Sequence, residues 1–278
     1  MIEFKNVSFS YNKNKILKSI NFKIEKGDFV AIIGSNGAGK TTISKLANGL
    51  LKPTSGEIYI NNENIKDKKV SLIAKTVGYL FQNPDRQICK NTIKEEILFS
   101  LKNIISDKEK IEEYYNKAIK FLKLDENISP FNLSRGQKQQ LALCCTIASQ
   151  PDIIILDEPT TGLDYKECDY LFNQIKQLNE IGKTIVIISH DIELVAQFAK
   201  TVICISDGEL VCFDKTNKAL WDIDMLKRCD VDPPQIVKLA NCFKNEYSQF
   251  SNVFTYEEMF QQIKLILKSN EKNIDFKE

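Results

Sequence analysis

Nine residues near the N-terminus have the types and the spacing that hold nucleotide phosphates. Residues 34–42 read GSNGAGKTT and follow the apolar run 29–33, which the pattern predicts to be a buried strand. Glycines let backbone N–H groups close around phosphate oxygens, the Lys40 ammonium reaches the β and γ oxygens, and the Thr41 hydroxyl can bind Mg²⁺. An ordinary glycine-rich loop explains neither the Lys-Thr pair nor the strand. The expected nucleotide contacts are Gly34, Ser35, Asn36, Gly37, Ala38, Gly39, Lys40, Thr41 and Thr42.

Two carboxylates follow a second apolar run, residues 153–156. Asp157 stands where a strand end holds Mg²⁺ beside the Thr41 hydroxyl. Glu158 is the next residue, and a carboxylate there can activate the water that attacks the γ-phosphate. Strands often end in solvated charges, so this pattern is weak alone. Residues 34–42, which have the P-loop spacing G-x-x-x-x-G-K-[ST], together with Pro159 and the turn at 162–164, strengthen the assignment of Asp157 and Glu158 to this site.

Residues 133–137 read LSRGQ ahead of a helical pattern. Ser134 and Gln137 have the spacing of a capping box, which would satisfy the first turn of that helix. A helix N-terminus with a serine hydroxyl, and with Gly136 allowing close approach, is also a phosphate-binding device. Because one chain cannot easily wrap both devices around one nucleotide, the sequence predicts a dimer with composite sites.

His190 is the only histidine, and it follows the strand-like run 184–189. A single histidine is more often structural than catalytic. Its position favours a functional role, because open α/β sheets bind their ligands at the carboxyl ends of parallel strands.

The composition narrows the class of protein. The 278 residues carry a net charge of +1 with a sequence pI near 7.4, so we expect no nucleic-acid partner. The eight cysteines are scattered without a C-x-x-C pair, which argues against a zinc site. No apolar run approaches the roughly 18 residues of a membrane span, and the N-terminus has no signal core. These features predict a cytoplasmic protein.

The chain divides into three parts by pattern. Residues 1–220 are expected to form an ATP-binding α/β domain that starts with antiparallel strands and contains an inserted helical subdomain over 83–150. Residues 221–278 are expected to form a helical extension that serves dimerisation. Pro233 and Pro234 open one amphipathic helix there, and Thr255 with Glu258 forms a capping box for another.

With these motifs together, residues 2–220 resemble the ATP-binding cassette (ABC) ATPases, which implies the P-loop NTPase fold of that family, ATP hydrolysis and Mg²⁺. The resemblance identifies 34–42 as Walker A, 153–157 as Walker B and 133–137 as the signature. It also implies roles for five single residues. Gln82 is the Q-loop glutamine and a metal ligand, Glu158 the catalytic glutamate, His190 the switch histidine, Asp164 the D-loop aspartate, and Tyr11 the adenine-stacking aromatic residue.

Residues 82–88 and 233–240 look like the energy-coupling factor (ECF) subgroup. That resemblance implies a second ATPase, in a homodimer or a heterodimer, under a membrane scaffold subunit and a small membrane substrate-binding subunit. It implies import of a vitamin or a transition-metal ion, with this chain peripheral on the cytoplasmic face of the cell membrane. Arg135 departs from the family, which usually has glycine at that position, and puts the turnover rate in question.

Other functions stay open at this point. The chain could be the ATPase of another ABC importer or exporter, since only the ECF-like stretches separate them. A soluble ABC ATPase acting on ribosomes or nucleic acid is disfavoured, because the chain has one cassette and only a compact insert between Lys40 and Asp157. A non-hydrolysing regulatory subunit is disfavoured by Glu158 and His190, although Arg135 keeps it in play.

Overall fold

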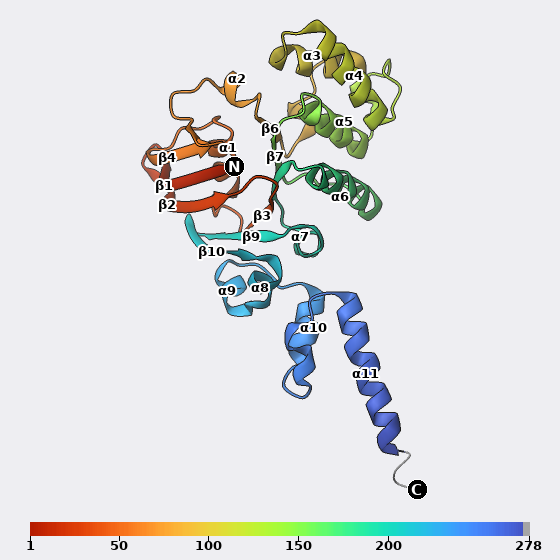
Figure 1. Ribbon diagram of the computed structural model, residues 1–278. Helices are drawn as coiled ribbons and strands as arrows, with labels where there is room; N and C mark the ends of the chain where they lie inside the picture. The colour runs from red at the N-terminus through yellow and green to blue at the C-terminus, as the bar shows by residue number, and fades with distance from the viewer. Residues whose placement is uncertain (275–278) are drawn as a thin grey trace.

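The computed structural model describes residues 1–274 (Figure 1). A central sheet has the strand order β10-β9-β3-β8-β7-β6. The five strands from β9 to the edge strand β6 are parallel, and β10 pairs antiparallel with β9. The strands are β3 (Phe29–Ile33), β6 (Val77–Leu80), β7 (Ile153–Asp157), β8 (Thr184–Ile188), β9 (Thr201–Ser206) and β10 (Glu209–Lys215).

Continuous apolar sequence explains why β3, β7 and β8 form the middle of this sheet. All five residues of each strand are buried, as expected where helices or a second sheet cover both faces. Parallel strands end at the same edge of the sheet. The P-loop, Gln82, the carboxylates of 157–158 and His190 all follow these strand ends, so the fold brings them to one edge.

A four-stranded antiparallel sheet, order β2-β1-β4-β5, packs against one face of the central sheet. Its strands are β1 (Ile2–Tyr11), β2 (Asn14–Ile24), β4 (Ser55–Ile60) and β5 (Glu63–Asn64). Alternating apolar residues of β1 and β2 share one core cluster with β3 and with α1 (Lys40–Ala47), while α2 (Val70–Ile73) lies outside the sheets. The expected antiparallel subdomain is present.

The inserted segment forms a helical subdomain with its own core. It contains α3 (Ile93–Ile104), α4 (Lys108–Leu122) and α5 (Arg135–Ile147), with the short 3₁₀ turns η1 (Pro84–Arg86) and η2 (Pro130–Asn132). Buried side chains from all three helices form one cluster, which includes the thiols of Cys144 and Cys145. Burial raises the pKa of Cys144 to about 12, so this thiol behaves as a small apolar side chain.

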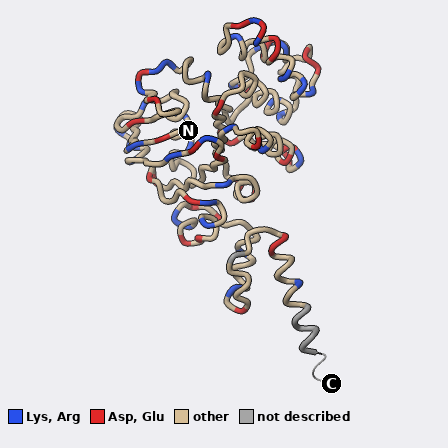
Figure 2. The backbone as a smooth tube through the Cα atoms, viewed as in Figure 1, with Lys and Arg blue, Asp and Glu red and all other residues tan. Residues whose placement is uncertain are grey.

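The opposite face of the central sheet is covered by α6 (Tyr165–Glu180) and α7 (Ile192–Phe198). Two short helices, α8 (Thr216–Trp221) and α9 (Ile223–Arg228), continue this layer, and Leu226 and Cys229 are fully buried in the same core. Lysines, arginines and acidic residues are interspersed along the backbone (Figure 2), as the small net charge suggests.

The last part of the chain has a separate small core. It contains α10 (Gln235–Phe243), the turn η3 (Ser248–Asn252) and α11 (Tyr256–Ile274), which extend away from the cassette (Figure 1). The predicted capping box is present, since Thr255 Oγ1 accepts from Glu258 N and Thr255 N donates to Glu258 Oε2. No described helix is long and apolar enough to cross a membrane.

Candidate nucleotide-binding site

The P-loop is held between β3 and α1 by backbone geometry. Gly34 has φ of 147°, and a Cβ there would lie 2.0 Å from the carbonyl oxygen of Ile205, so only glycine fits. Helix α1 begins after Gly39, and no side chain caps its first turn. Its N-terminal N–H groups and the positive end of its dipole are therefore directed toward the loop, where phosphates are expected.

Lys40 is buried beneath this loop. Its Nζ donates to the carbonyl oxygens of Gly34 and Ser35, both at 2.8 Å. Burial lowers the pKa of Lys40, while the carboxylates of Glu158 and Asp157 oppose that shift. The ammonium is thus placed in the P-loop by hydrogen bonds that a phosphate group can replace.

Oxygen atoms that suit Mg²⁺ meet next to the P-loop. Thr41 Oγ1 donates to Asp157 Oδ1 at 3.3 Å, although the two residues are 116 positions apart in sequence. Asp157 is 4% exposed, and burial raises its pKa, opposed by hydrogen bonds from Tyr79 and Thr41. A hydroxyl and a carboxylate are the hard donors that Mg²⁺ prefers, so these two residues fit that ion.

Glu158 is the centre of a second cluster. Its Oε2 accepts from Gln82 Nε2 at 2.5 Å, and its Oε1 lies 2.8 Å from Nε2 of His190. The Thr161 hydroxyl also donates to Oε2, at 3.4 Å. The backbone of Glu158 has φ of 49°, in the left-handed region that glutamate rarely adopts. The structure thus joins three predicted catalytic residues, and Gln82 contacts Glu158 rather than Asp157.

The signature residues belong to the helical subdomain. Ser134 and Gln137 form the predicted capping box at the start of α5, with N–H···O distances of 3.2 and 2.9 Å. Gly136 also lets the Glu167 side chain on α6 approach the start of α5, because a Cβ at Gly136 would lie 2.0 Å from Glu167 Oε1. The sequence does not predict this contact. The phosphate-binding role of these residues stays a prediction.

Two further predicted contacts occupy the ends of their elements. Tyr11 ends β1 with 45% of its surface exposed, and its ring packs edge-on against Phe9 at 4.7 Å. Asp164 is the N-cap of α6, where its Oδ1 accepts from Glu167 N at 2.8 Å. Their roles in nucleotide binding, Tyr11 at adenine and Asp164 as the D-loop aspartate, stay predictions.

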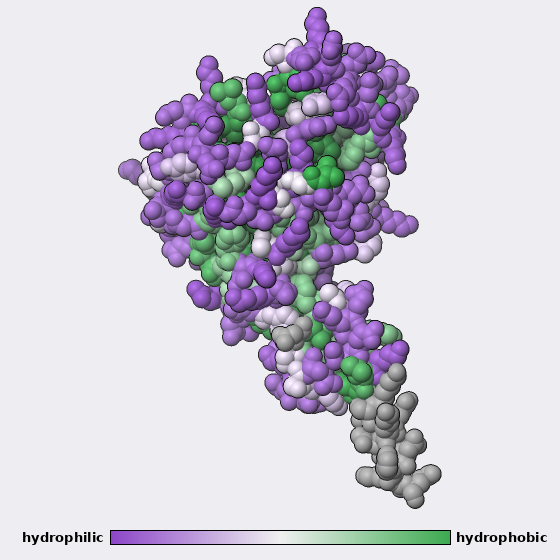
Figure 3. Space-filling view, viewed as in Figure 1, coloured by the Kyte–Doolittle hydropathy of each residue, from purple (hydrophilic) through white to green (hydrophobic). Residues whose placement is uncertain are grey.

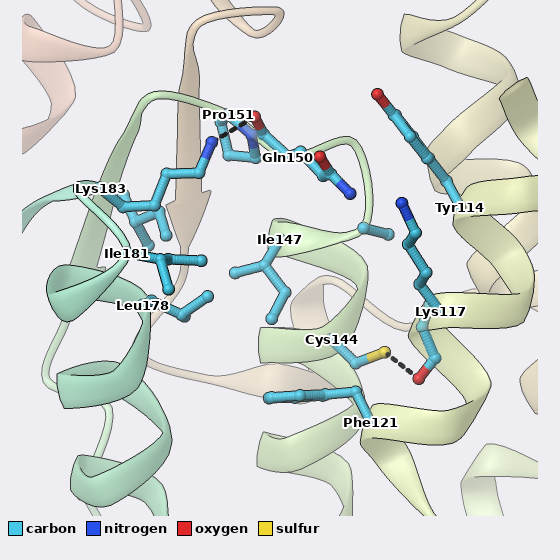
Figure 4. Close-up of a pocket in the computed structure, with 13 residues that line it drawn as sticks. Tyr114, Lys117, Phe121, Cys144, Ile147, Gln150, Pro151, Leu178, Ile181 and Lys183 are labelled. Atoms are coloured by element: carbon cyan, nitrogen blue, oxygen red, sulfur yellow. Dashed lines mark hydrogen bonds between the residues drawn. The ribbon is translucent and has the colours of Figure 1, made fainter.

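Two hollows on the surface are candidates for the nucleotide pocket, and their lining residues distinguish them. One, of about 190 Å³, is lined by P-loop residues, by His190, and by Asp230 and Asp232 at the base of the C-terminal extension. The other, of about 220 Å³, is mostly apolar and lies between α4, α5 and the end of α6 (Figure 4). None of the predicted site residues lines the second hollow, so the nucleotide is expected at the first.

A phosphate loop before a helix, a magnesium-type carboxylate at the end of another strand of the same parallel sheet and a second carboxylate beside it define a P-loop nucleoside triphosphatase. Comparison with known proteins narrows this class. The family model described as "ABC transporter" matches residues 17–161. The chain therefore belongs to the ABC transporter family, as an ATP-binding and ATP-hydrolysing subunit.

The similar proteins include ECF subunits. An "Energy-coupling factor transporter ATP-binding protein EcfA" of Methanocaldococcus jannaschii is 38% identical over 86% of this chain and 88% of its own length. An ABC transporter ATP-binding protein of Caldanaerobacter subterraneus is 39% identical over 87% of this chain, which spans only 43% of that relative. The resemblance to the ECF subgroup is thus confirmed.

Solved structures agree with the fold. CbiO1 of Clostridium perfringens, described as part of the ABC transporter complex cbiONQ, superposes with a TM-score of 0.73 at 27% identity, over 86% of this chain and 98% of that one. The cassette MJ0796, a dimer bound to ADP and Pi, gives a TM-score of 0.71 at 32% identity, over 78% and 99%. The predicted ABC cassette fold is confirmed.

Proposed function

We propose that this chain is the ATP-hydrolysing subunit of an ECF-type importer, working as a dimer on the cytoplasmic face of the membrane. The observation that carries the proposal is the cluster of Gln82, Glu158 and His190 at the end of the P-loop sheet. EcfA and CbiO1, which the chain resembles, support the importer class. The cargo would be a vitamin or a transition-metal ion, carried by separate membrane subunits.

In this proposal each site residue has a defined task. The P-loop and Lys40 bind the phosphates of ATP, while Thr41, Asp157 and Gln82 hold Mg²⁺, which neutralises charge on the phosphate oxygens. Glu158 accepts a proton from the attacking water, and His190 orients that carboxylate through its contact at 2.8 Å. Ser134, Gly136, Gln137 and Asp164 act across the dimer interface, and Tyr11 stacks on adenine.

The segment 82–94 is the proposed contact with the membrane scaffold. It leads from Gln82 to the helical subdomain, and Asp85 pairs with Lys138 on α5 at 2.9 Å. At its far end the buried carboxylate of Glu96 accepts from the backbone N–H groups of Cys89 and Lys90, at 2.8 and 2.7 Å. A change in the position of Gln82 would therefore be passed along segment 82–94 to the helical subdomain, to which the segment is hydrogen-bonded.

Site-directed cross-linking tests this contact. In a background with Cys89 and Cys242, the exposed native thiols, changed to serine, Asp85→Cys is expected to form an adduct with a membrane subunit in native membranes. Lys66→Cys, an exposed position in the antiparallel subdomain, serves as the matched control. Absence of any adduct from Asp85→Cys and from a restored Cys89, with both thiols reactive, would contradict the proposal.

The C-terminal extension is the proposed dimerisation element. Four apolar side chains at helical spacing on α11, Tyr256, Phe260, Ile263 and Leu267, are 40–63% exposed, while Met259 at the edge of this stripe is buried. Figure 3 shows hydrophobic side chains among hydrophilic ones on this part of the surface. A second ATPase is the proposed occupant of this face, because the resemblance to the ECF subgroup implies a pair of ATPases and one EcfA relative matches 95% of this chain, extension included.

A further inference from the structure

A tyrosine hydroxyl reaches the carboxylate that is proposed to bind Mg²⁺. Tyr79 lies on β6, and its phenol donates to Asp157 Oδ2 at 2.8 Å. Strand register explains the contact. Tyr79 pairs with Ile155 on the parallel strand β7, and Asp157 lies two residues further on, so its side chain emerges on the same face of the sheet.

This hydrogen bond belongs to a network of three elements. Ser44 Oγ on α1 lies 3.0 Å from the Tyr79 hydroxyl, and Ser44 itself donates to the carbonyl oxygen of Thr41 at 2.9 Å. Thr41 Oγ1 donates to the other oxygen of Asp157, Oδ1, at 3.3 Å. Each carboxylate oxygen therefore has a different partner, the phenol on Oδ2 and the P-loop threonine on Oδ1.

The partners of the two oxygens differ in a way that matters for a metal ion. Thr41 is itself a proposed ligand, so Oδ1 lies on the side where Mg²⁺ would sit. Tyr79 has no such role, and its phenol holds the other oxygen, Oδ2. A buried carboxylate with only one fixed oxygen could rotate about its terminal bond, whereas two hydrogen bonds leave it one orientation.

We propose that Tyr79 is a positioning residue for the metal-ligating Asp157. Its hydroxyl fixes Oδ2, so that Oδ1 is presented beside Thr41 before the ion arrives. The inference rests on the proposed magnesium site and adds a residue that no motif in the sequence marks. Outer partners of this kind raise metal affinity because the ligand pays no orientation cost when the ion binds.

The substitution Tyr79→Phe isolates the hydroxyl. Phenylalanine keeps the ring that packs edge-on against Phe81 at 4.7 Å, and Ser44 keeps its bond to Thr41. Oδ2 of Asp157 loses its donor, and Ser44 Oγ loses its contact with the phenol at 3.0 Å. A matched control exists on the other sheet, where the Tyr59 hydroxyl donates to Glu57 Oε2 at 2.8 Å on the surface, so Tyr59→Phe makes the same chemical change away from the site.

The probe is Mn²⁺, titrated into the full-length chain saturated with a non-hydrolysable ATP analogue and followed by the electron paramagnetic resonance of free Mn²⁺. Tyr79→Phe is expected to raise the Kd for Mn²⁺ by about 10- to 100-fold. Affinity for the metal-free nucleotide, measured in EDTA, is expected to change by less than about 2-fold, because no phosphate contact is lost. Tyr59→Phe is expected to alter neither value.

Asp157→Asn separates the two ways in which the inference can fail. Wild-type Mn²⁺ affinity in Asp157→Asn would overturn the metal site itself and the inference with it. Weak binding in Asp157→Asn together with unchanged binding in Tyr79→Phe would overturn the role of Tyr79 alone. A Tyr79→Phe chain that unfolds, or that loses metal-free nucleotide to the same extent as Mn²⁺, would show that the phenol only supports the fold.

Discussion

Glu158 is the residue on which hydrolysis depends in the proposed function. Its carboxylate is oriented by contacts with Gln82 and His190. The contact uses the Nε2 donor of Gln82, whereas a metal ion would bind the amide oxygen Oε1.

Glu158→Gln is expected to retain ATP binding and to lower turnover by about 10²- to 10⁴-fold, because the amide keeps the shape but cannot accept the proton from water. The measurements are steady-state phosphate release and equilibrium nucleotide binding. Glu209→Gln, the same change at an exposed carboxylate that pairs with Lys18, is the control and is expected to hydrolyse normally. Hydrolysis by Glu158→Gln near the wild-type rate would remove Glu158 from the role of base.

Single residues with a motif were predictable, and their partners were not. The P-loop, Asp157 and Glu158 follow from residue type and local spacing. The contact between Gln82 and Glu158 joins positions 76 apart, and the contact between Tyr79 and Asp157 joins positions 78 apart. Both depend on β6 and β7 being neighbours in the sheet, which no local pattern specifies.

At the scale of elements, α5 and α6 are joined at their N-termini. Arg135 Nε donates to the carbonyl oxygen of Thr161 at 2.9 Å, in the loop that leads from Glu158 to Asp164. A Cβ on Gly162 would lie 2.4 Å from the same nitrogen, so the loop approaches the guanidinium closely. The unusual arginine of the signature thus has a partner within its own chain, which the sequence alone did not suggest.

Arg135→Ala is expected to loosen this loop. Loss of one exposed hydrogen bond of about 1 kcal/mol corresponds to a roughly 5-fold faster amide exchange over residues 160–164, measured by hydrogen–deuterium exchange. Arg135→Lys is expected to resemble Arg135→Ala, because lysine lacks the fixed Nε donor. Lys166→Ala, an exposed cation in the first turn of α6, is the control. Unchanged exchange in Arg135→Ala would refute the link.

The helices of the extension show how far periodicity predicts packing. The sequence places Ile236, Leu239, Ala240 and Phe243 on one face of α10. The structure buries Ile236 and Ala240 together with Val237, but leaves Leu239 and Phe243 at 44% and 39% exposure. The apolar face of α10 is wider than the core cluster it packs on, so only part of it is buried. Periodicity alone does not predict which part.

For the whole molecule, the extension is a second packing unit on one side of the cassette. Its core cluster is separate, but Phe254 packs against both this cluster and the cassette core. Leu226 and Cys229 belong to the cassette core, so a deletion after residue 220 would expose buried side chains. Substitutions on the exposed face of α11 therefore test dimerisation more cleanly than truncation.

The double variant Phe260→Glu/Leu267→Glu is expected to weaken the nucleotide-free dimer by about 10-fold or more, since two exposed apolar contacts become charged. Sedimentation velocity over a concentration series measures this. Lys264→Glu, on the same helix, controls for charge alone. ATP affinity of the monomer is expected to be unchanged. A double variant that dimerises as tightly as wild type would assign the exposed face another purpose.

The left-handed backbone at Glu158 lowers the stability of the fold at a residue that the proposed hydrolysis requires. Holding a glutamate at φ of 49° costs on the order of 1–3 kcal/mol, whereas glycine adopts this conformation freely. Laboratory selection for thermal stability alone would thus favour glycine at position 158. The selected variants would be more stable, and they would bind the nucleotide without hydrolysing it. A stabilisation campaign on this chain has to exclude that position from its library.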